Sequence, residues 1–159
     1  MPIQRITPFL WFDHQAEEAA SFYTSIFPNS NVGKIARYGE GGPGPAGTAM
    51  TVQFQLDGLS FMGLNGGPHF KFTEAVSFVV NCQNQEEVDY YWQKLSAGGA
   101  EVQCGWLKDK FGLSWQIVPT ALAELMSDPD PEKSGRVMKA IMSMMKLDIR
   151  ALQQAYDNA

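Results

Sequence analysis

The feature that most constrains the fold of this chain is an internal repeat. Residues 17–23 and 86–92 each begin with two acidic residues and carry adjacent aromatic residues five and six positions later, at an offset of 69 residues. The tetrapeptides GLSF at 58–61 and GLSW at 112–115 match at an offset of 54 residues. Because a repeated supersecondary unit restricts the whole architecture, we expect both halves to share one order of strands and helices.

The two offsets differ because the first half contains a loop that the second half lacks. Residues 39–47 read GEGGPGPAG, a composition typical of an inserted loop. This loop lacks the GxGxxG order of nucleotide-binding loops, and Pro43 and Pro45 remove amide donors that such loops use. The glycines therefore do not indicate a phosphate-binding site.

Each half is predicted to fold as β-α-β-β-β. The β-prone runs 9–12 and 76–80 both precede acidic helix starts, and the alternation of apolar residues over 50–56 is typical of a half-buried strand. Asp13 and Asn84 are the candidate helix N-caps, the second in a capping box with a glutamate three residues later.

The chain from Thr120 onward is predicted to be helical, because glycine is nearly absent and Met, Ala, Leu and Lys dominate. One helix should begin at Asp130 with a proline at its first position, and another at Asp148. Four methionines lie between positions 138 and 145, where core or dimer packing is the expected role. We expect one compact α+β unit made of a first module at 1–67, a second at 68–119 and C-terminal helices at 120–159.

Composition and charge exclude several classes of function. A formal charge of -5 and a pI near 4.9 argue against binding to nucleic acid, which requires clustered Lys and Arg. No apolar run is long enough to cross a membrane, and residues 1–12 do not have the pattern of a signal peptide. The two cysteines have neither a disulfide framework nor zinc-site spacing, so we expect a cytoplasmic protein.

Several strings in the chain resemble a known family. They are PFLWFD at 8–13, LNGGP at 64–68, CGW at 104–106, FGLSWQIVP at 111–119 and DPDP at 128–131. With the two modules, they resemble the PhnB-like branch of the vicinal-oxygen-chelate superfamily, often described as 3-demethylubiquinone-9 3-methyltransferase-like. The superfamily includes glyoxalases, bleomycin-resistance proteins, fosfomycin-resistance enzymes and extradiol dioxygenases. The resemblance extends over essentially the whole chain and implies curled mixed sheets with a C-terminal helical tail.

In metal-using relatives, the resemblance implies four ligands, a His or Gln from the first strand and a Glu from the last strand of each module. The superfamily spacing and the repeat offsets carry these positions onto Pro8, Met62, Ser77 and Gln116. Divalent ions of such sites need imidazoles or carboxylates, whereas Pro8 has no donor atom and Met62 offers a soft thioether. We therefore expect no metal at these positions and no cofactor, while a metal held by other residues stays open.

The remaining candidates each have a functional and a structural interpretation. His69 lies in a loop that could form the rim of a ligand cup, whereas His14 at a strand-to-helix turn is expected to face solvent. Cys104 is interpreted as a small pocket-lining residue rather than a nucleophile, and the ring of Trp106 could cover a cavity mouth. Arg37, with the tyrosine after it, could meet an anionic ligand or form a solvated strand end.

The predicted function is the binding of a small organic molecule in an apolar, partly polar cup without the usual metal. Strand alternation places Ser114 on the same face as Gln116. The expected ligand-contacting residues are Met62, Asn65, His69, Ser77, Cys104, Trp106, Ser114 and Gln116. We also expect a homodimer, as is common in this group.

Two alternatives to metal-free binding stay open. One is an enzyme, either of glyoxalase or dioxygenase type with a non-standard metal site or the methyltransferase that the family description names. Against methyl transfer, the usual S-adenosylmethionine-dependent class needs a doubly wound sheet with a glycine turn, which this sequence does not predict. The other alternative is a catalytically inert packing or regulatory module, because this architecture supports many functions.

Overall fold

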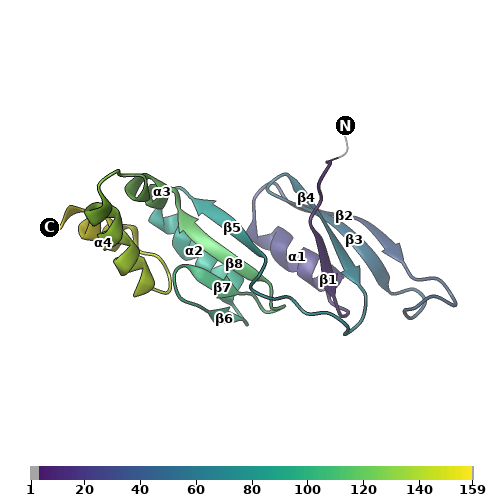
Figure 1. Ribbon diagram of the computed structural model, residues 1–159. Helices are drawn as coiled ribbons and strands as arrows, with labels where there is room; N and C mark the ends of the chain where they lie inside the picture. The colour runs from purple at the N-terminus through teal and green to yellow at the C-terminus, as the bar shows by residue number, and fades with distance from the viewer. Residues whose placement is uncertain (1–3, 159) are drawn as a thin grey trace. The chain divides into compact units, whose positions relative to one another are not determined.

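The computed structural model describes residues 4–158 and divides the chain into two compact units, 1–72 and 73–159. Each unit contains a four-stranded mixed sheet, and the strand and helix order is β-α-β-β-β in both (Figure 1). The α+β fold and the internal repeat predicted from the sequence are therefore confirmed. The expected module boundaries, after residues 67 and 119, stay predictions.

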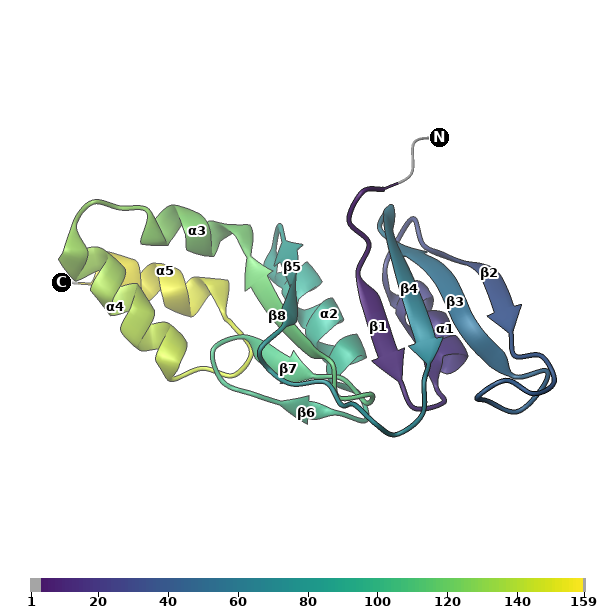
Figure 2. The same ribbon diagram turned by 45° about the vertical axis from the view of Figure 1, so that its right-hand side comes forward.

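The first unit is built around the sheet β1-β4-β3-β2, in which β1 and β4 run parallel and the other pairs antiparallel. Its elements are β1 (Phe9–Phe12), α1 (Ala16–Ile26), β2 (Asn31–Arg37), β3 (Ala49–Leu56) and β4 (Leu59–Asn65). Helix α1 lies against one face of this sheet (Figures 1 and 2). The other face has no helix of its own unit on it, and we call it the open face.

The apolar core of the first unit lies between α1 and its sheet. Tyr23 of α1 is fully buried and stacks on Phe54 of β3 with ring centroids 6.2 Å apart, and Phe54 stacks in turn on Phe61 at 5.3 Å. Gly63 favours the close approach of the helix, since a Cβ there would lie 3.3 Å from the Cβ of Ala16, which is a tight contact. Alternation therefore places the residues on either side of Gly63 and Phe61 on the open face.

The second unit repeats this arrangement with the sheet β5-β8-β7-β6, in which β5 and β8 run parallel. Its module elements are β5 (Ser77–Cys82), α2 (Gln85–Ser96), β6 (Ala100–Glu101), β7 (Trp106–Lys108) and β8 (Ser114–Pro119). Val88, Trp92 and Leu95 form the buried face of α2. The indole of Trp92 also donates to the carboxylate of Glu101 across 2.6 Å, which links the helix to the edge of the sheet.

Three further helices complete the second unit: α3 (Thr120–Met126), α4 (Pro131–Met142) and α5 (Ile149–Asp157). They surround an apolar cluster of Leu125, Val137, Ile141, Leu147 and Leu152. Of the four methionines between positions 138 and 145, Met144 packs against this cluster, whereas Met138, Met142 and Met145 are 45%, 62% and 49% exposed. For these three the core role does not apply, and packing in a dimer stays a prediction. None of the helices in residues 4–158 is long and apolar enough to span a bilayer.

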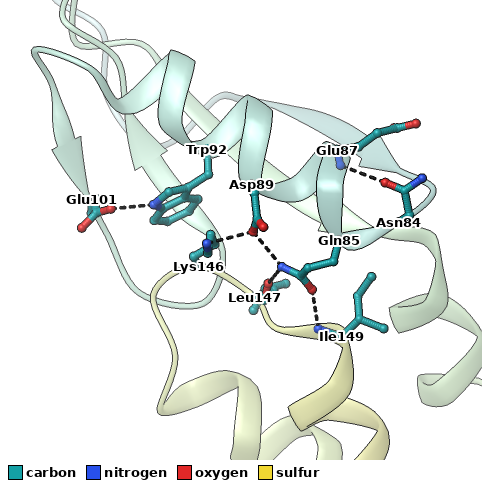
Figure 3. Close-up of polar contacts among 9 residues, drawn as sticks. All are labelled: Asn84, Gln85, Glu87, Asp89, Trp92, Glu101, Lys146, Leu147 and Ile149. Atoms are coloured by element: carbon teal, nitrogen blue, oxygen red, sulfur yellow. Dashed lines mark hydrogen bonds and ion pairs between the residues drawn. The ribbon is translucent and has the colours of Figure 1, made fainter.

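The tail is fastened to α2 by polar contacts (Figure 3). The side-chain amide of Gln85 donates to the carbonyl of Leu147 at 3.1 Å and accepts from the backbone N–H of Ile149 at 2.8 Å. Beside it, the ammonium of Lys146 lies 2.8 Å from the carboxylate of Asp89. The side-chain amide of Gln85 thus pairs with two backbone groups of the tail, the carbonyl of Leu147 and the N–H of Ile149.

Helix caps show where local sequence predicts structure and where it does not. Asn84, Asp130 and Asp148 cap α2, α4 and α5 through side-chain oxygens, as predicted. The prediction for Asp13 is wrong, because the N-cap of α1 is Gln15, which makes no side-chain cap bond. The first amide of α1, on Ala16, instead donates to the side chain of Asn65 on β4, at 2.8 Å.

Candidate functional site

The open face of the first sheet carries a polar cleft of about 490 Å³. Its side chains come mainly from β3, β4 and the segment before β1, and they include Gln4, Thr7, Gln53, Gln55, Ser60 and Met62. The side-chain amide of Gln4 donates to the carbonyl of Ser60 at 3.1 Å and accepts from its N–H at 3.2 Å. Met62, predicted to contact a ligand, therefore lies in a cleft with mostly uncharged hydrogen-bonding neighbours.

Strand register corrects one of the four expected metal positions. Phe9 lies opposite Met62 in the first sheet, and Val79 lies opposite Gln116 in the second. The first strands of the modules are thus offset by 70 residues, although the helices are offset by 69. The counterpart of Ser77 is therefore Thr7, which lines the cleft, and the assignment of Pro8 is wrong.

The face of the second sheet that is turned away from α2, which we call the open face of that sheet, brings together four of the predicted ligand residues. Gln116 donates its side-chain amide to the hydroxyl of Ser77 at 2.9 Å, Ser77 lies opposite Ser114, and Trp106 lies opposite Gln116. Alternation puts these residues on one face, while Trp115 and Ile117, both buried, face the helix. We call Ser77, Ser114 and Gln116 the polar row.

The hydroxyl of Ser114 is the exceptional group in this row. Ser114 is only 1% exposed, and its oxygen is the one side-chain N or O atom found buried without a hydrogen-bond partner in residues 4–158. A buried polar group that lacks a partner costs roughly 1–3 kcal/mol. Lys108, opposite Ser114, is ion-paired with Glu74, so its ammonium is already engaged.

The four expected metal positions, with Thr7 in place of Pro8, do not fit a divalent metal ion. Thr7 and Ser77 offer neutral hydroxyls, Met62 offers a thioether, and Gln116 offers a neutral amide whose nitrogen donates to Ser77. None of them supplies the imidazole or carboxylate that ions such as Mn²⁺ or Zn²⁺ prefer. Over residues 4–158, no group of three or more His, Cys, Asp or Glu side chains is arranged to share a metal ion.

Asn65 and His69 lie in a second and larger cleft of the first unit, about 1040 Å³ in volume. This cleft shares no lining residue with the open-face cleft. Both ends of the Asn65 amide are used, since its oxygen accepts from Ala16 and its nitrogen donates to the carbonyl of Ala49 at 3.1 Å. Asn65 therefore shapes the wall of this cleft and caps α1.

Cys104 lies away from both clefts. It packs against the apolar cluster of the tail, and its N–H donates to the carbonyl of Met144 at 2.8 Å. Its backbone has a φ of 65°, a left-handed conformation that is uncommon outside glycine. The contacts of Cys104 are thus those of a residue that anchors the tail.

The eight predicted residues therefore occupy four places in the structure. The polar row with Trp106 holds four, Met62 lies on the open face of the first sheet, Asn65 and His69 share the larger cleft, and Cys104 contacts the tail. The sequence interpretation missed Thr7, Gln53 and Gln55. The alternation of polar and apolar residues in β3 was the signal that could have identified the two glutamines.

Comparison with known proteins identifies relatives for most of the chain. A family model described as 3-demethylubiquinone-9 3-methyltransferase matches residues 4–118. The solved PhnB protein of Bacillus cereus is 41% identical, with a TM-score of 0.68, and the match covers 74% of this chain and 100% of that one. A comparison with curated proteins finds no match.

More distant structures share the fold. A protein of Pseudomonas aeruginosa has a TM-score of 0.61 at 20% identity, with 74% of this chain and 98% of that chain covered. The fosfomycin resistance protein FosX of Listeria monocytogenes, solved with Mn(II) and sulfate, has a TM-score of 0.53 at 18% identity. The match covers 79% of this chain and 97% of that chain. These similarities confirm the expected vicinal-oxygen-chelate fold. The family match ends at residue 118, so the DPDP string at 128–131 and the three tail helices lie beyond it.

Proposed function

We propose that this chain, which belongs to the family described as 3-demethylubiquinone-9 3-methyltransferase and to the vicinal-oxygen-chelate superfamily, binds a small organic molecule without a metal ion. Where metal-using relatives are expected to have a His or Gln and a Glu from each module, the open faces of its sheets carry two hydroxyls, a thioether and one amide. Such groups recognise a neutral, polar molecule through hydrogen bonds.

The observation that carries this proposal is the unpaired hydroxyl of Ser114 beside the bonded pair Ser77 and Gln116. A ligand acceptor that reached Ser114 would remove the cost of burying an unpaired group. Trp106, opposite Gln116, adds an amphipathic ring suited to covering an organic ligand. The proposed contacts on the second sheet are therefore the polar row and Trp106.

A thermal-shift screen tests this proposal. We expect neutral polar metabolites at about 100 times their Kd to raise the Tm by about 5 to 10 °C, because such saturation adds about 2.7 kcal/mol of stability. The shift should disappear in Gln116→Leu, which keeps side-chain volume and removes the amide, and persist in the exposed-loop control Gln103→Leu.

Two results would overturn the proposal. One is stoichiometric Mn, Fe, Ni or Zn in the purified protein that is lost in Gln116→Ala, because this would indicate a metalloenzyme. The other is a screen in which none of the compounds raises the Tm, which would favour an inert packing module. Methyl transfer of the usual S-adenosylmethionine-dependent kind has less support, because both sheets are four-stranded and neither is doubly wound.

We also propose a cytoplasmic homodimer that uses the exposed methionines of the tail. Met138 and Met142 lie one turn apart on α4, and Met145 follows the helix, which makes an apolar surface of adaptable side chains. Light scattering should give a mass twice the 17.6 kDa of one chain, and one chain's mass for Met138→Lys/Met142→Lys. The control Val102→Lys, at another exposed apolar position, should remain dimeric. A monomeric wild-type protein would contradict this assembly.

A further inference from the structure

The larger cleft of the first unit has the features of a separate binding site. It lies where β1 and β4 end, beside the start of α1, and the inserted glycine- and proline-rich loop forms one wall. Its volume of about 1040 Å³ is at the upper end of what small-molecule sites offer. The second module has no counterpart of this loop, so this cleft belongs to the first module alone.

Trp11 forms one fixed aromatic wall of the cleft. Its indole N–H donates to the carbonyl of Gly67 at 2.9 Å, and the ring of Phe70 packs edge-on with centroids 4.8 Å apart. A Cβ on Gly66 would lie 2.3 Å from the indole, so only glycine permits this approach. The hydrogen bond and the packing hold the indole in place before any ligand arrives.

Tyr38 forms a second fixed wall. Its hydroxyl donates to the carbonyl of Asn65 at 2.5 Å, and its backbone pairs with Gly47 and Thr48 across the base of the loop, at 2.8 and 2.9 Å. A Cβ on Gly44 would lie 2.5 Å from the phenol ring, so the loop rests directly on the ring. Because both aromatic side chains that line the cleft are held in place, a ligand that contacts them pays a smaller entropy cost on binding.

The charges that line the cleft favour a cation. Asp13 and Glu17 contribute carboxylates and Arg37 the one guanidinium, which leaves a formal charge of -1 with neutral histidines. Arg37 is already engaged, because it lies 3.8 Å from the carboxylate of Glu17 and donates to the carbonyl of Gly47 at 3.3 Å. An anionic ligand would have to displace these contacts and approach two carboxylates.

We propose that this cleft binds a small organic cation, such as a quaternary or protonated amine. Indole and phenol rings attract cations through their electron-rich faces, and the carboxylate of Asp13 adds attraction by charge. This site is distinct from the open-face cleft and from the polar row, because the larger cleft shares no lining residue with either of them.

Calorimetric titration of the full chain with choline and with its neutral isostere 3,3-dimethylbutan-1-ol tests this inference. We expect choline to bind at least about tenfold more tightly than the neutral isostere, and benzoate not to bind. Asp13→Asn and Tyr38→Leu should each weaken choline binding by about fivefold to tenfold. The control Asp57→Asn makes the same change in the turn between β3 and β4, outside the cleft, and should leave the affinity unchanged.

The inference is overturned if the neutral isostere or benzoate binds as tightly as choline, or if Asp13→Asn binds choline like wild type. Asp13→Asn preserves side-chain shape at a half-exposed position, so its result does not depend on whether Tyr38→Leu folds. The titration of Asp13→Asn probes a residue that lines this cleft and does not line the open-face cleft. Its failure and the failure of the proposed metal-free site are therefore distinguishable.

Discussion

The side-chain amide of Gln116 donates a hydrogen bond of 2.9 Å to the hydroxyl of Ser77, which lies on the parallel strand beside it. Since a net hydrogen bond contributes about 1 kcal/mol, Gln116→Leu and Ser77→Ala should each lower the free energy of unfolding by about that amount. In Gln116→Leu/Ser77→Ala the two costs should not add, because both changes remove the same bond. Urea denaturation of the four proteins measures the coupling, and strictly additive costs would show that the bond contributes nothing.

The amide of Gln85 should control how firmly the tail is held. Gln85→Ala leaves the carbonyl of Leu147 and the N–H of Ile149 without their partner (Figure 3). We expect a loss of about 1 to 3 kcal/mol in the free energy of unfolding. Hydrogen exchange at α5 should accelerate more than exchange at β3, because the tail opens locally while the first sheet keeps its contacts.

The exposed residue Gln153 on α5 provides a matched control for this change. Gln153→Ala removes a glutamine from the helix itself but no bond between the tail and α2, so exchange at α5 should stay close to wild type. Equal acceleration in both variants would show that α5 responds to its own helix stability and not to the amide of Gln85.

Local signals in the sequence were sufficient for the repeat, the order of elements and three of the caps. Asn84, Asp130 and Asp148 cap through an N–H two or three residues away, so the information lies within one turn of helix. The buried face of α1, which includes Tyr23, likewise follows the helical spacing of its apolar residues. Such features depend on neighbours in sequence, which pattern analysis reads directly.

The features that could not be predicted depend on contacts between distant residues. Asn65 caps α1 from 49 positions away, and its own string only suggested a loop. The expected metal position moves from Pro8 to Thr7 because the first strands of the two modules are offset by one residue more than their helices are. Only the register of the strands shows this difference. The contact between Cys104 and Met144 could not be predicted for the same reason, since Met144 belongs to the tail.

Asp109 is a buried carboxylate whose bonds hold the turn before β8. It is 2% exposed and accepts from the N–H groups of Phe111 and Leu113 at 2.8 and 3.0 Å, and from the indole of Trp115 at 2.9 Å. Asp109→Asn should lower the free energy of unfolding by about 3 kcal/mol. In the variant, an amide NH2 group would take the place of one carboxylate oxygen and would face an N–H donor instead of accepting from it. Chemical denaturation measures this cost.

The partner indole offers a specific check on this explanation. In the background Trp115→Phe the donor facing the second oxygen is gone, so Asp109→Asn should cost about 1 kcal/mol less than in wild type. A cost that is the same in both backgrounds would show that the indole bond is not what the asparagine disrupts.

The two cysteines should differ sharply in reactivity. Burial, with a smaller contribution from the nearby Glu87 carboxylate, raises the pKa of the Cys82 thiol from 9.0 to about 12. Because the thiolate is the reactive form, Cys82 should resist labelling by DTNB at pH 8, while the half-buried Cys104 reacts. We expect one fast thiol per chain in native buffer and two after unfolding in urea.

The same pKa shift predicts how stability depends on pH. Because folding raises the pKa of this thiol, its contribution to the stability of the folded state is fully present below pH 9, the ordinary pKa of the thiol. This contribution is lost as the pH rises from 9 towards 12, the pKa in the folded state. Cys82→Ala should therefore lose less stability than wild type between pH 8 and pH 10.5, as measured by urea midpoints. Cys104→Ser should have no fast thiol at pH 8. Rapid labelling of native Cys104→Ser would show that Cys82 is accessible and would contradict both expectations.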